Sequence, residues 1–278
     1  MWTEITRRQY ERKHLGCSSN LSDAEWAAIE TRLPQCNRLG RPPKTEMRSV
    51  VNAVLSMHCS YMLRTGCQWR QLPCEFPPFT TVQHYFYAWR DGGVLERINF
   101  ELLVQARETA GREPSPSAGV IDSQSVKTTE AGGPRGFDAA KKNQRLQASV
   151  ITDTTGLLVG AQVHVADVQD RDGGPLVIAA IHDLFPWLRH LFADGAYAGD
   201  KLSNTLTKFG DWTIEVVPRI ADVVGFAVLP RRWVVERTLA WLNRNRRLAK
   251  DFEATIASAK AWLYLASVQL LLRRLARG

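Results

Sequence analysis

Two aspartates each follow a short run of apolar residues. Asp122 follows Ala118 to Ile121, and Asp194 follows Leu191 to Ala193. Such short runs predict β-strands, and α/β sheets present their working side chains at the ends of strands. Each aspartate, taken alone, is better explained as a helix cap or a turn former. The pair becomes a candidate chemical centre when a third carboxylate joins it.

The third carboxylate is Glu236, within the helical pattern LPRRWVVERTLAWLNRNRRLAKDF. On such a helix Arg232, Glu236 and Asn243 share one face. The alternative interpretation is an ordinary surface ion pair between Glu236 and Arg232, one helical turn apart. Three carboxylates suit a hard divalent cation such as Mg²⁺ or Mn²⁺, because these ions prefer oxygen ligands.

The sequence around Glu236 is the most basic in the chain. Its cations are Arg231, Arg232, Arg237, Arg244, Arg246, Arg247 and Lys250. A solvated helix would balance these charges with acids, yet Glu236 is the only acid between Arg231 and Lys250. The pattern therefore predicts contacts with the phosphate backbone of DNA.

The composition agrees with a polyanionic partner. The chain has 36 Lys and Arg against 28 Asp and Glu, a formal charge of +8, and 45% hydrophobic residues over 278 positions. This predicts a globular protein with one large core and a smaller domain. The longest uncharged run, Ala261 to Leu272, is shorter than the roughly 20 residues that cross a bilayer, so it predicts a buried helix and no membrane partner.

Two other features concern location. The N-terminus lacks the apolar run of a secretory signal, so we expect a cytoplasmic protein, associated with the nucleoid if it binds DNA. The five cysteines show no spacing typical of zinc ligands. We expect them to be reduced thiols in the core.

The first part of the chain predicts helices. Ser22 and Glu25 have the spacing of a capping box, with a helix to about Arg32. Apolar residues recur at helical spacing from Thr45 to about Arg64, and Gly66 stops that helix. A further helix, capped by Thr80 or Thr81, buries Val82, Tyr85, Phe86 and Trp89.

The opposite face of this last helix carries Gln83, His84, Tyr87 and Arg90. In a DNA groove, Gln and Arg can make bidentate contacts with base edges. The alternative is an ordinary helical hairpin with a solvated face, because the preceding turn is too long for a standard helix-turn-helix. Both interpretations stay open from spacing alone.

A Pro-, Ser- and Gly-rich stretch divides the chain. We predict a small all-α, helix-turn-helix-like DNA-binding domain over residues 1–110, a linker over 111–119 and an α/β domain over 120–278. Within the second domain, Asp167, Asp170 and Asp172 resemble a metal cluster. We interpret Asp172 as the N-cap of a helix beginning near Pro175 and the other two as turn formers.

Long motifs extend across nearly the whole chain, from about Leu21 to Ala276. They include LSDAEW, GRPPK, TGCQWRQLP, FPPFTTVQHYFYAWR, IDSQSVKTTEAGGPRGFDA, ADVQDRDG, FADGAYAGDK and LPRRWVVERTLAWLNRNRRLAKDFE. In these stretches the sequence resembles the DDE-type bacterial insertion-sequence transposases, in particular the insertion-sequence-five group. Because the motifs are long, the resemblance is specific.

The resemblance implies a ribonuclease-H-like mixed sheet with flanking helices, in which Asp122, Asp194 and Glu236 are the catalytic acids and ligands of two Mg²⁺ or Mn²⁺ ions. Water would cleave the DNA at the element's ends, and the freed 3′-hydroxyls would join to target DNA. The expected partners are double-stranded DNA, as terminal inverted repeats and target, and a second copy of the chain that pairs two ends. The alternatives are a decayed copy that only binds DNA and a nuclease of the same fold.

The sequence departs from its relatives at three places. Around Glu236 the family signature has a Tyr and a Lys where this chain has Leu229 and Asn243. Arg244 or Arg247 would supply the missing cation. Residues 143–149 read NQRLQAS where relatives carry a Gly-Arg-Lys-Arg-His run. We therefore predict that this copy folds and binds metal but transposes poorly.

Overall fold

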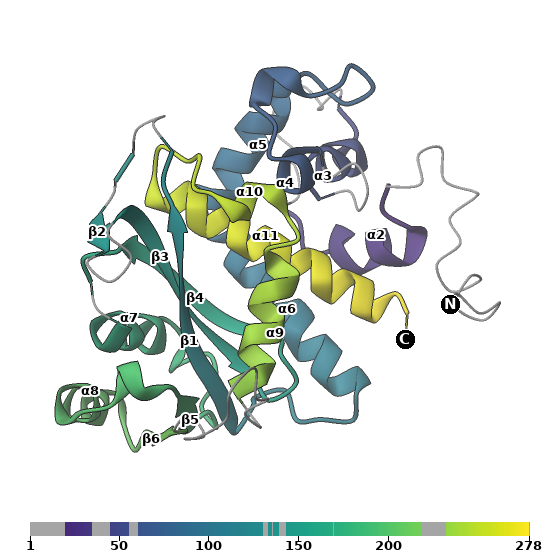
Figure 1. The fold of residues 1–278 in the computed structure, drawn as a ribbon. Coiled ribbons are helices and arrows are strands. Elements are labelled where there is room, and N and C mark those ends of the chain that lie inside the picture. The colour runs from purple at the N-terminus through teal and green to yellow at the C-terminus, as the bar shows by residue number, and fades with distance from the viewer. Residues whose placement is uncertain are drawn as a thin grey trace, which may run out of the picture.

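The computed structural model describes residues 20–34, 45–55, 61–129, 133–134, 136–138, 143–168, 170–217 and 232–277. Its N-terminal part is helical, as predicted (Figure 1). The helices are α2 (Asp23–Glu30), α3 (Met47–Leu55), α4 (Tyr61–Thr65), α5 (Phe79–Asp91) and α6 (Val94–Thr109), with a 3₁₀ turn η1 (Trp69–Gln71) before α5.

The ends of these helices follow local chemistry. The Ser22 hydroxyl accepts a hydrogen bond from the Glu25 amide, and the Glu25 carboxylate accepts one from the Ser22 amide, which confirms the predicted capping box. Gly66 follows α4 with a φ of +69°, a left-handed conformation that favours glycine. The predicted cap of α5 was wrong, because the helix begins at Phe79 after Pro78, without a side-chain cap, and both threonines lie inside it.

The second part of the chain forms a mixed sheet, with six strands among the described residues. They are β1 (Ala118–Lys127), β2 (Gly136–Asp138), β3 (Asn143–Asp153), β4 (Leu158–Val165), β5 (His190–Ala193) and β6 (Thr213–Val216). β3 is antiparallel to β1, β2 and β4, whereas β5 is parallel to both β1 and β6. The main order is β4-β3-β1-β5-β6, with β2 beside β3. This is the ribonuclease-H-like arrangement that the resemblance implies.

Helix α7 (Asp170–Ile181) packs closely on the sheet. A Cβ atom at Gly173 would lie 2.5 Å from His164 Nε2, and one at Gly174 would lie 3.3 Å from Ile121, so glycines permit this contact. The helix begins before the predicted position, which places Asp172 in its first turn and corrects its interpretation as the N-cap. The connections to β6 include the 3₁₀ turns η2 (Gly195–Tyr197) and η3 (Thr207–Phe209) and helix α8 (Asp200–Leu206).

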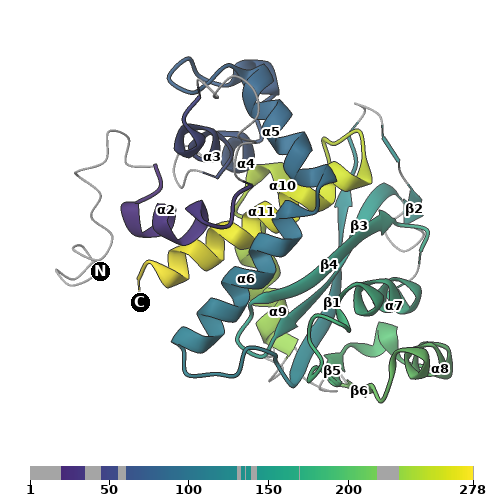
Figure 2. The same ribbon diagram turned by 180° about the vertical axis from the view of Figure 1, so that it is seen from behind.

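The C-terminal helices are α9 (Arg232–Leu242), α10 (Arg246–Ala249) and α11 (Ile256–Leu275). Both ribbon views show α11 lying between the N-terminal helices and the sheet (Figures 1 and 2). Trp262 on α11 is fully buried and stacks on Phe86 of α5, with ring centroids 4.5 Å apart. One hydrophobic core therefore joins both parts of the chain. The predicted division into domains stays a prediction.

Ala261 to Leu272 is mainly buried within α11, as predicted, and none of the described helices is long and apolar enough to cross a membrane. The prediction of core cysteines was wrong for Cys74, which is exposed, whereas Cys67 is half-buried and packs against the core; neither of these two is part of a disulfide. The other three cysteines lie outside the described residues.

Candidate active site

Asp122 lies in the middle of β1, opposite Val150 of β3. The predicted strand end was wrong, because β1 continues to Lys127 beyond the apolar run. This continuation is held by pairing with β3. The Asp122 Oδ1 atom accepts a hydrogen bond from the Ser123 amide at 2.8 Å, which fixes one carboxylate oxygen.

Asp194 directly follows β5, as predicted. It caps the 3₁₀ turn η2, and its Oδ1 atom accepts a hydrogen bond from the Ala196 amide at 2.9 Å. Since β5 is the parallel neighbour of β1, the two aspartates lie on adjacent strands. One oxygen of each aspartate is therefore anchored to its own backbone.

Glu236 lies on α9, which packs against β1. The Nη2 atom of Arg232 lies 3.5 Å from Glu236 Oε1 and 3.7 Å from Asp194 Oδ2. The i,i+4 pair expected as an alternative does form, but Arg232 is only 8% exposed and also reaches the second acid. The guanidinium thus joins two of the three predicted carboxylates.

Asp122, the remaining carboxylate, belongs to the same electrostatic environment. Burial raises the pKa of Asp122 to about 6. The hydrogen bond from the Ser123 amide and the positive charge of Arg232 oppose this rise in pKa. The negative charges of Asp194 and Glu236 add to it. Around Asp122, the two negative charges of Asp194 and Glu236 therefore face the single positive charge of Arg232.

A divalent cation fits the chemistry of this site, because all three acids offer oxygen ligands. Among the described residues, however, no three Asp, Glu, His or Cys side chains converge closely enough to hold a metal ion. Arg232 lies beside two of the acids and supplies the positive charge there.

Two family models match the chain over its two parts. One, described as "Putative transposase of IS4/5 family", matches residues 21–99, and the other, described as "Transposase DDE domain", matches residues 113–271, more than half of the chain. The chain belongs to the DDE transposase family. This confirms the resemblance, including the ribonuclease-H-like domain, and DNA as the partner on which such enzymes act.

A curated relative from Sinorhizobium fredii, "Uncharacterized protein y4sN", is 33% identical over 88 residues. The match covers 32% of the transposase chain and 64% of the relative, so it spans less than two thirds of that protein. No solved structure matches the chain.

The transposase's predicted DNA-binding arginines differ in their surroundings. Arg237 donates to the carbonyl oxygen of Thr155 at 2.8 Å and stacks on Trp233 and Trp241, 4.6 and 4.7 Å from their ring centroids. Arg244 and Lys250 are exposed. Arg231 lies outside the described residues.

Arg247 is buried, which argues against its predicted contact with DNA. It forms an ion pair with Glu253 at 2.6 Å and donates to the Cys67 carbonyl oxygen at 2.9 Å. Its guanidinium also lies 4.3 Å from the ring centroid of Trp262. The sequence places Arg247 in a basic run, but its contacts tie α10, the segment after α4 and α11 together.

The predicted outer face of α5 is only partly open. His84 and Tyr87 are exposed, but Gln83 donates to the Tyr87 hydroxyl at 3.1 Å. Arg90 is paired with Asp91, stacks 4.5 Å from the Tyr87 ring centroid, and donates to Ser258 at 2.9 Å. The four side chains lie together on α5, and their DNA contacts stay a prediction.

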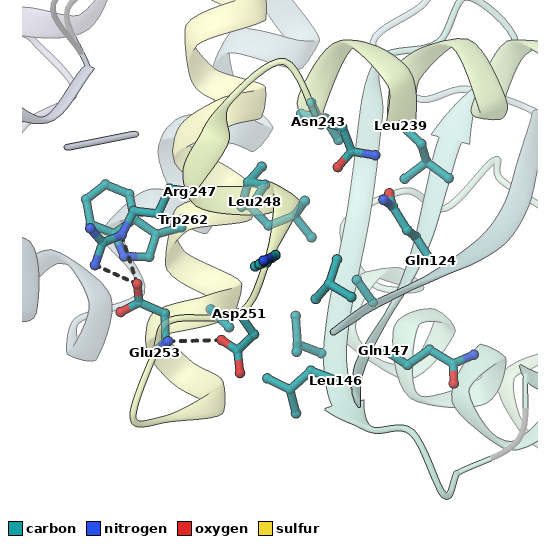
Figure 3. Close-up of a pocket in the computed structure, with 17 residues that line it drawn as sticks. Gln124, Leu146, Gln147, Leu239, Asn243, Arg247, Leu248, Asp251, Glu253 and Trp262 are labelled. Carbon is teal, nitrogen blue, oxygen red and sulfur yellow. Dashed lines mark hydrogen bonds and ion pairs between the residues drawn. The ribbon is translucent and has the colours of Figure 1, made fainter. Parts of the chain in front are cut away.

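A pocket of about 60 Å³ lies between the strands and the C-terminal helices (Figure 3). Gln124, two residues beyond Asp122 on β1, and Asn243, after α9, are among its lining residues. Side chains two apart on a strand share a face, so Gln124 lies on the Asp122 face of the sheet. Strand alternation could have identified Gln124 from sequence, had β1 been predicted to continue.

Proposed function

We propose that this transposase cleaves the ends of its own insertion sequence and joins the freed 3′-hydroxyls to target DNA. The observation that carries the proposal is the gathering of Asp122, Asp194 and Glu236, from β1, β5 and α9, around one environment that includes Arg232. Membership of the DDE transposase family supports the assignment of these three acids as catalytic residues.

The acids would hold two Mg²⁺ or Mn²⁺ ions, which stabilise charge on the attacking and leaving oxygens of an in-line displacement. The chain's own groups prepare this site. Amides of Ser123 and Ala196 each bind one aspartate oxygen and leave the other oxygen as a possible ligand. Arg232 would then turn from Asp194 and Glu236 toward the phosphate of the bound DNA.

Binding of the element's ends would involve basic and polar side chains away from the three acids. The exposed Arg244 and Lys250 follow α9, where they would contact phosphates near the cleaved strand. His84 and Tyr87 would contact the terminal inverted repeats from the exposed face of α5, with Gln83 and Arg90 beside them. Because two ends must be paired, we propose a homodimer on DNA.

The test is metal-dependent nicking of a plasmid that carries the element with its flanking DNA. The wild-type chain should nick at the element's ends in Mg²⁺ and not in a chelator. Asp122→Ala, Asp194→Ala and Glu236→Ala should each abolish nicking while DNA affinity stays nearly unchanged. Asp211→Ala, which removes an exposed acid elsewhere, is the matched control.

Three outcomes separate the candidate functions. Nicking followed by joining to a target supports the transposase. Nicking without joining indicates a nuclease of the same fold. Binding of the ends without nicking in either metal indicates a copy that only binds DNA.

A further inference from the structure

A second concavity, of about 510 Å³, lies beside the end of α9. Five arginines line it, from α4, from the turn after α9 and from the C-terminal end of α11: Arg64, Arg244, Arg273, Arg274 and Arg277. No aspartate or glutamate is among its lining residues. We name it the arginine pocket.

The arginine pocket and the acids lie on different sides of α9. Trp241 lines the pocket and is five residues beyond Glu236. At 3.6 residues per turn, this spacing places the two side chains about 140° apart around the helix. DNA held at the acids would therefore have to pass over the exposed side of α9 to reach the pocket.

Stabilisation of helix ends accounts for only part of this charge. Arg64 lies in the last turn of α4, and Arg273 and Arg274 lie in the last turn of α11. A helix C-terminus carries roughly half a negative elementary charge, so the ends of α4, α9 and α11 together supply about −1.5. Even without Arg273 and Arg277, the other three guanidinium groups exceed this by about one and a half positive charges. The excess indicates an anionic ligand.

We propose that the arginine pocket binds the phosphate backbone of duplex DNA whose scissile phosphate lies at the three acids. This rests on the proposed function of those acids. Guanidinium groups bind phosphate oxygens in a bidentate manner, and several of them along a surface follow a backbone better than a single free anion.

The position of the pocket sets where it would contact DNA. From Glu236 to Trp241, which lines the pocket, is five residues, or about 7.5 Å along α9, and crossing the helix adds about 10 Å. The resulting separation of about 12 Å corresponds to roughly four nucleotides of one strand. The pocket would therefore bind the duplex next to the cleavage position and hold it in register.

The test compares two double variants of the full chain. Arg244→Gln with Arg274→Gln removes two exposed arginines of the pocket, and Arg112→Gln with Lys208→Gln removes two exposed cations elsewhere. Affinity for a labelled duplex of mixed sequence is measured against salt concentration, in a chelator so that no cleavage occurs. The pocket variant should bind on the order of tenfold more weakly at low salt. Its log–log salt slope should fall by about 1.8, since each lost contact contributes about 0.9.

Several results would overturn the proposal. A pocket variant that binds the duplex as well as the control variant does would exclude the contact. A pocket variant that loses affinity for inorganic pyrophosphate, measured by calorimetry, but keeps its affinity for the duplex would indicate a site for small anions instead. Replacement of both arginines by lysine should largely restore the salt slope if charge is what matters.

The two proposals fail in different measurements. If the wild-type chain does not nick DNA in Mg²⁺, the proposed function fails, whereas the salt slopes in chelator still report on the arginine pocket. If the slopes of the two variants agree while nicking still depends on the three acids, only the arginine pocket fails.

Discussion

Arg232 on α9, a helix that packs against β1, lies 3.7 Å from Asp194, which directly follows β5. The same guanidinium lies 3.5 Å from Glu236. It therefore offsets charge repulsion between Asp194 and Glu236. This relationship makes Arg232 a competitor of any cation that the acids bind.

Replacement of Arg232 by Gln should strengthen metal binding by the free protein. The guanidinium no longer competes, and the carboxylates are left with an unbalanced charge. We expect the variant to be less stable without metal and to gain more in melting temperature from added Mg²⁺ than the wild type gains. A gain equal to or smaller than that of the wild type would show that Arg232 does not occupy the cation's place.

Replacement of Asp122 by Asn should stabilise the metal-free protein above pH 6. The folded state raises the pKa of Asp122 from 3.8 to about 6, so between these values the folded state binds more protons than the unfolded state. Stability from this group is therefore fully present below pH 3.8 and is lost as pH rises through 6. The shift corresponds to about 3 kcal/mol, which Asn would recover because it carries no charge.

The measurement for Asp122 is chemical denaturation of both proteins from pH 4 to pH 8, in a chelator. The difference in free energy of unfolding should be largest at the high end and vanish at the low end. Asp211→Asn gives the effect of removing an exposed carboxylate. A constant difference across this range would contradict a buried, charge-sensitive Asp122.

Two adjacent arginines, Arg246 and Arg247, should differ in how much their replacement lowers the stability of the protein. Arg247 is buried and paired with the partly buried Glu253, so Arg247→Gln leaves this carboxylate without its partner and should cost about 3 kcal/mol. Arg246 is exposed, so Arg246→Gln should change stability little. Thermal and denaturant unfolding measure the first effect. If Arg247→Gln instead flattens the salt dependence of DNA binding without loss of stability, Arg247 contacts DNA after all.

Sequence patterns predicted elements whose signals are local. The capping box at Ser22, the stop at Gly66 and the strand before Asp194 depend on neighbouring residues, and the structure confirms them. The length of β1 could not be predicted in this way. Its second half, beyond Asp122, is polar and forms a strand because β3 pairs with it over its whole length.

The contacts of the charged residues could also not be predicted from the sequence. Arg232, Arg237, Arg244 and Arg247 belong to one basic stretch, yet their surroundings differ. Arg232 contacts two acids, Arg237 stacks on tryptophans, Arg244 lines a pocket, and Arg247 pairs with a partly buried glutamate. The partners of Arg247 lie in segments far from it in sequence, and no spacing rule connects Arg247 with Cys67 or Trp262. Only the packing of α11 against both parts of the chain brings them together.

The altered segment of β3 offers the last prediction. The strand survives the change, as expected, and pairs with β1 beside Asp122. Ala148 lies opposite Gln124, on the Asp122 face of the sheet, and lines the pocket of Figure 3, so it is the position at which a restored cation would reach DNA near the acids.

Ala148→Arg should therefore raise the excision frequency of a marked element in cells, compared at equal protein level. Ala148→Gln, which adds a polar side chain without charge, is the control for filling the pocket. A gain with both variants would assign the effect to packing, because Gln adds volume and hydrogen-bonding groups but no charge. No gain with Arg would mean that the missing cations of this segment do not limit transposition.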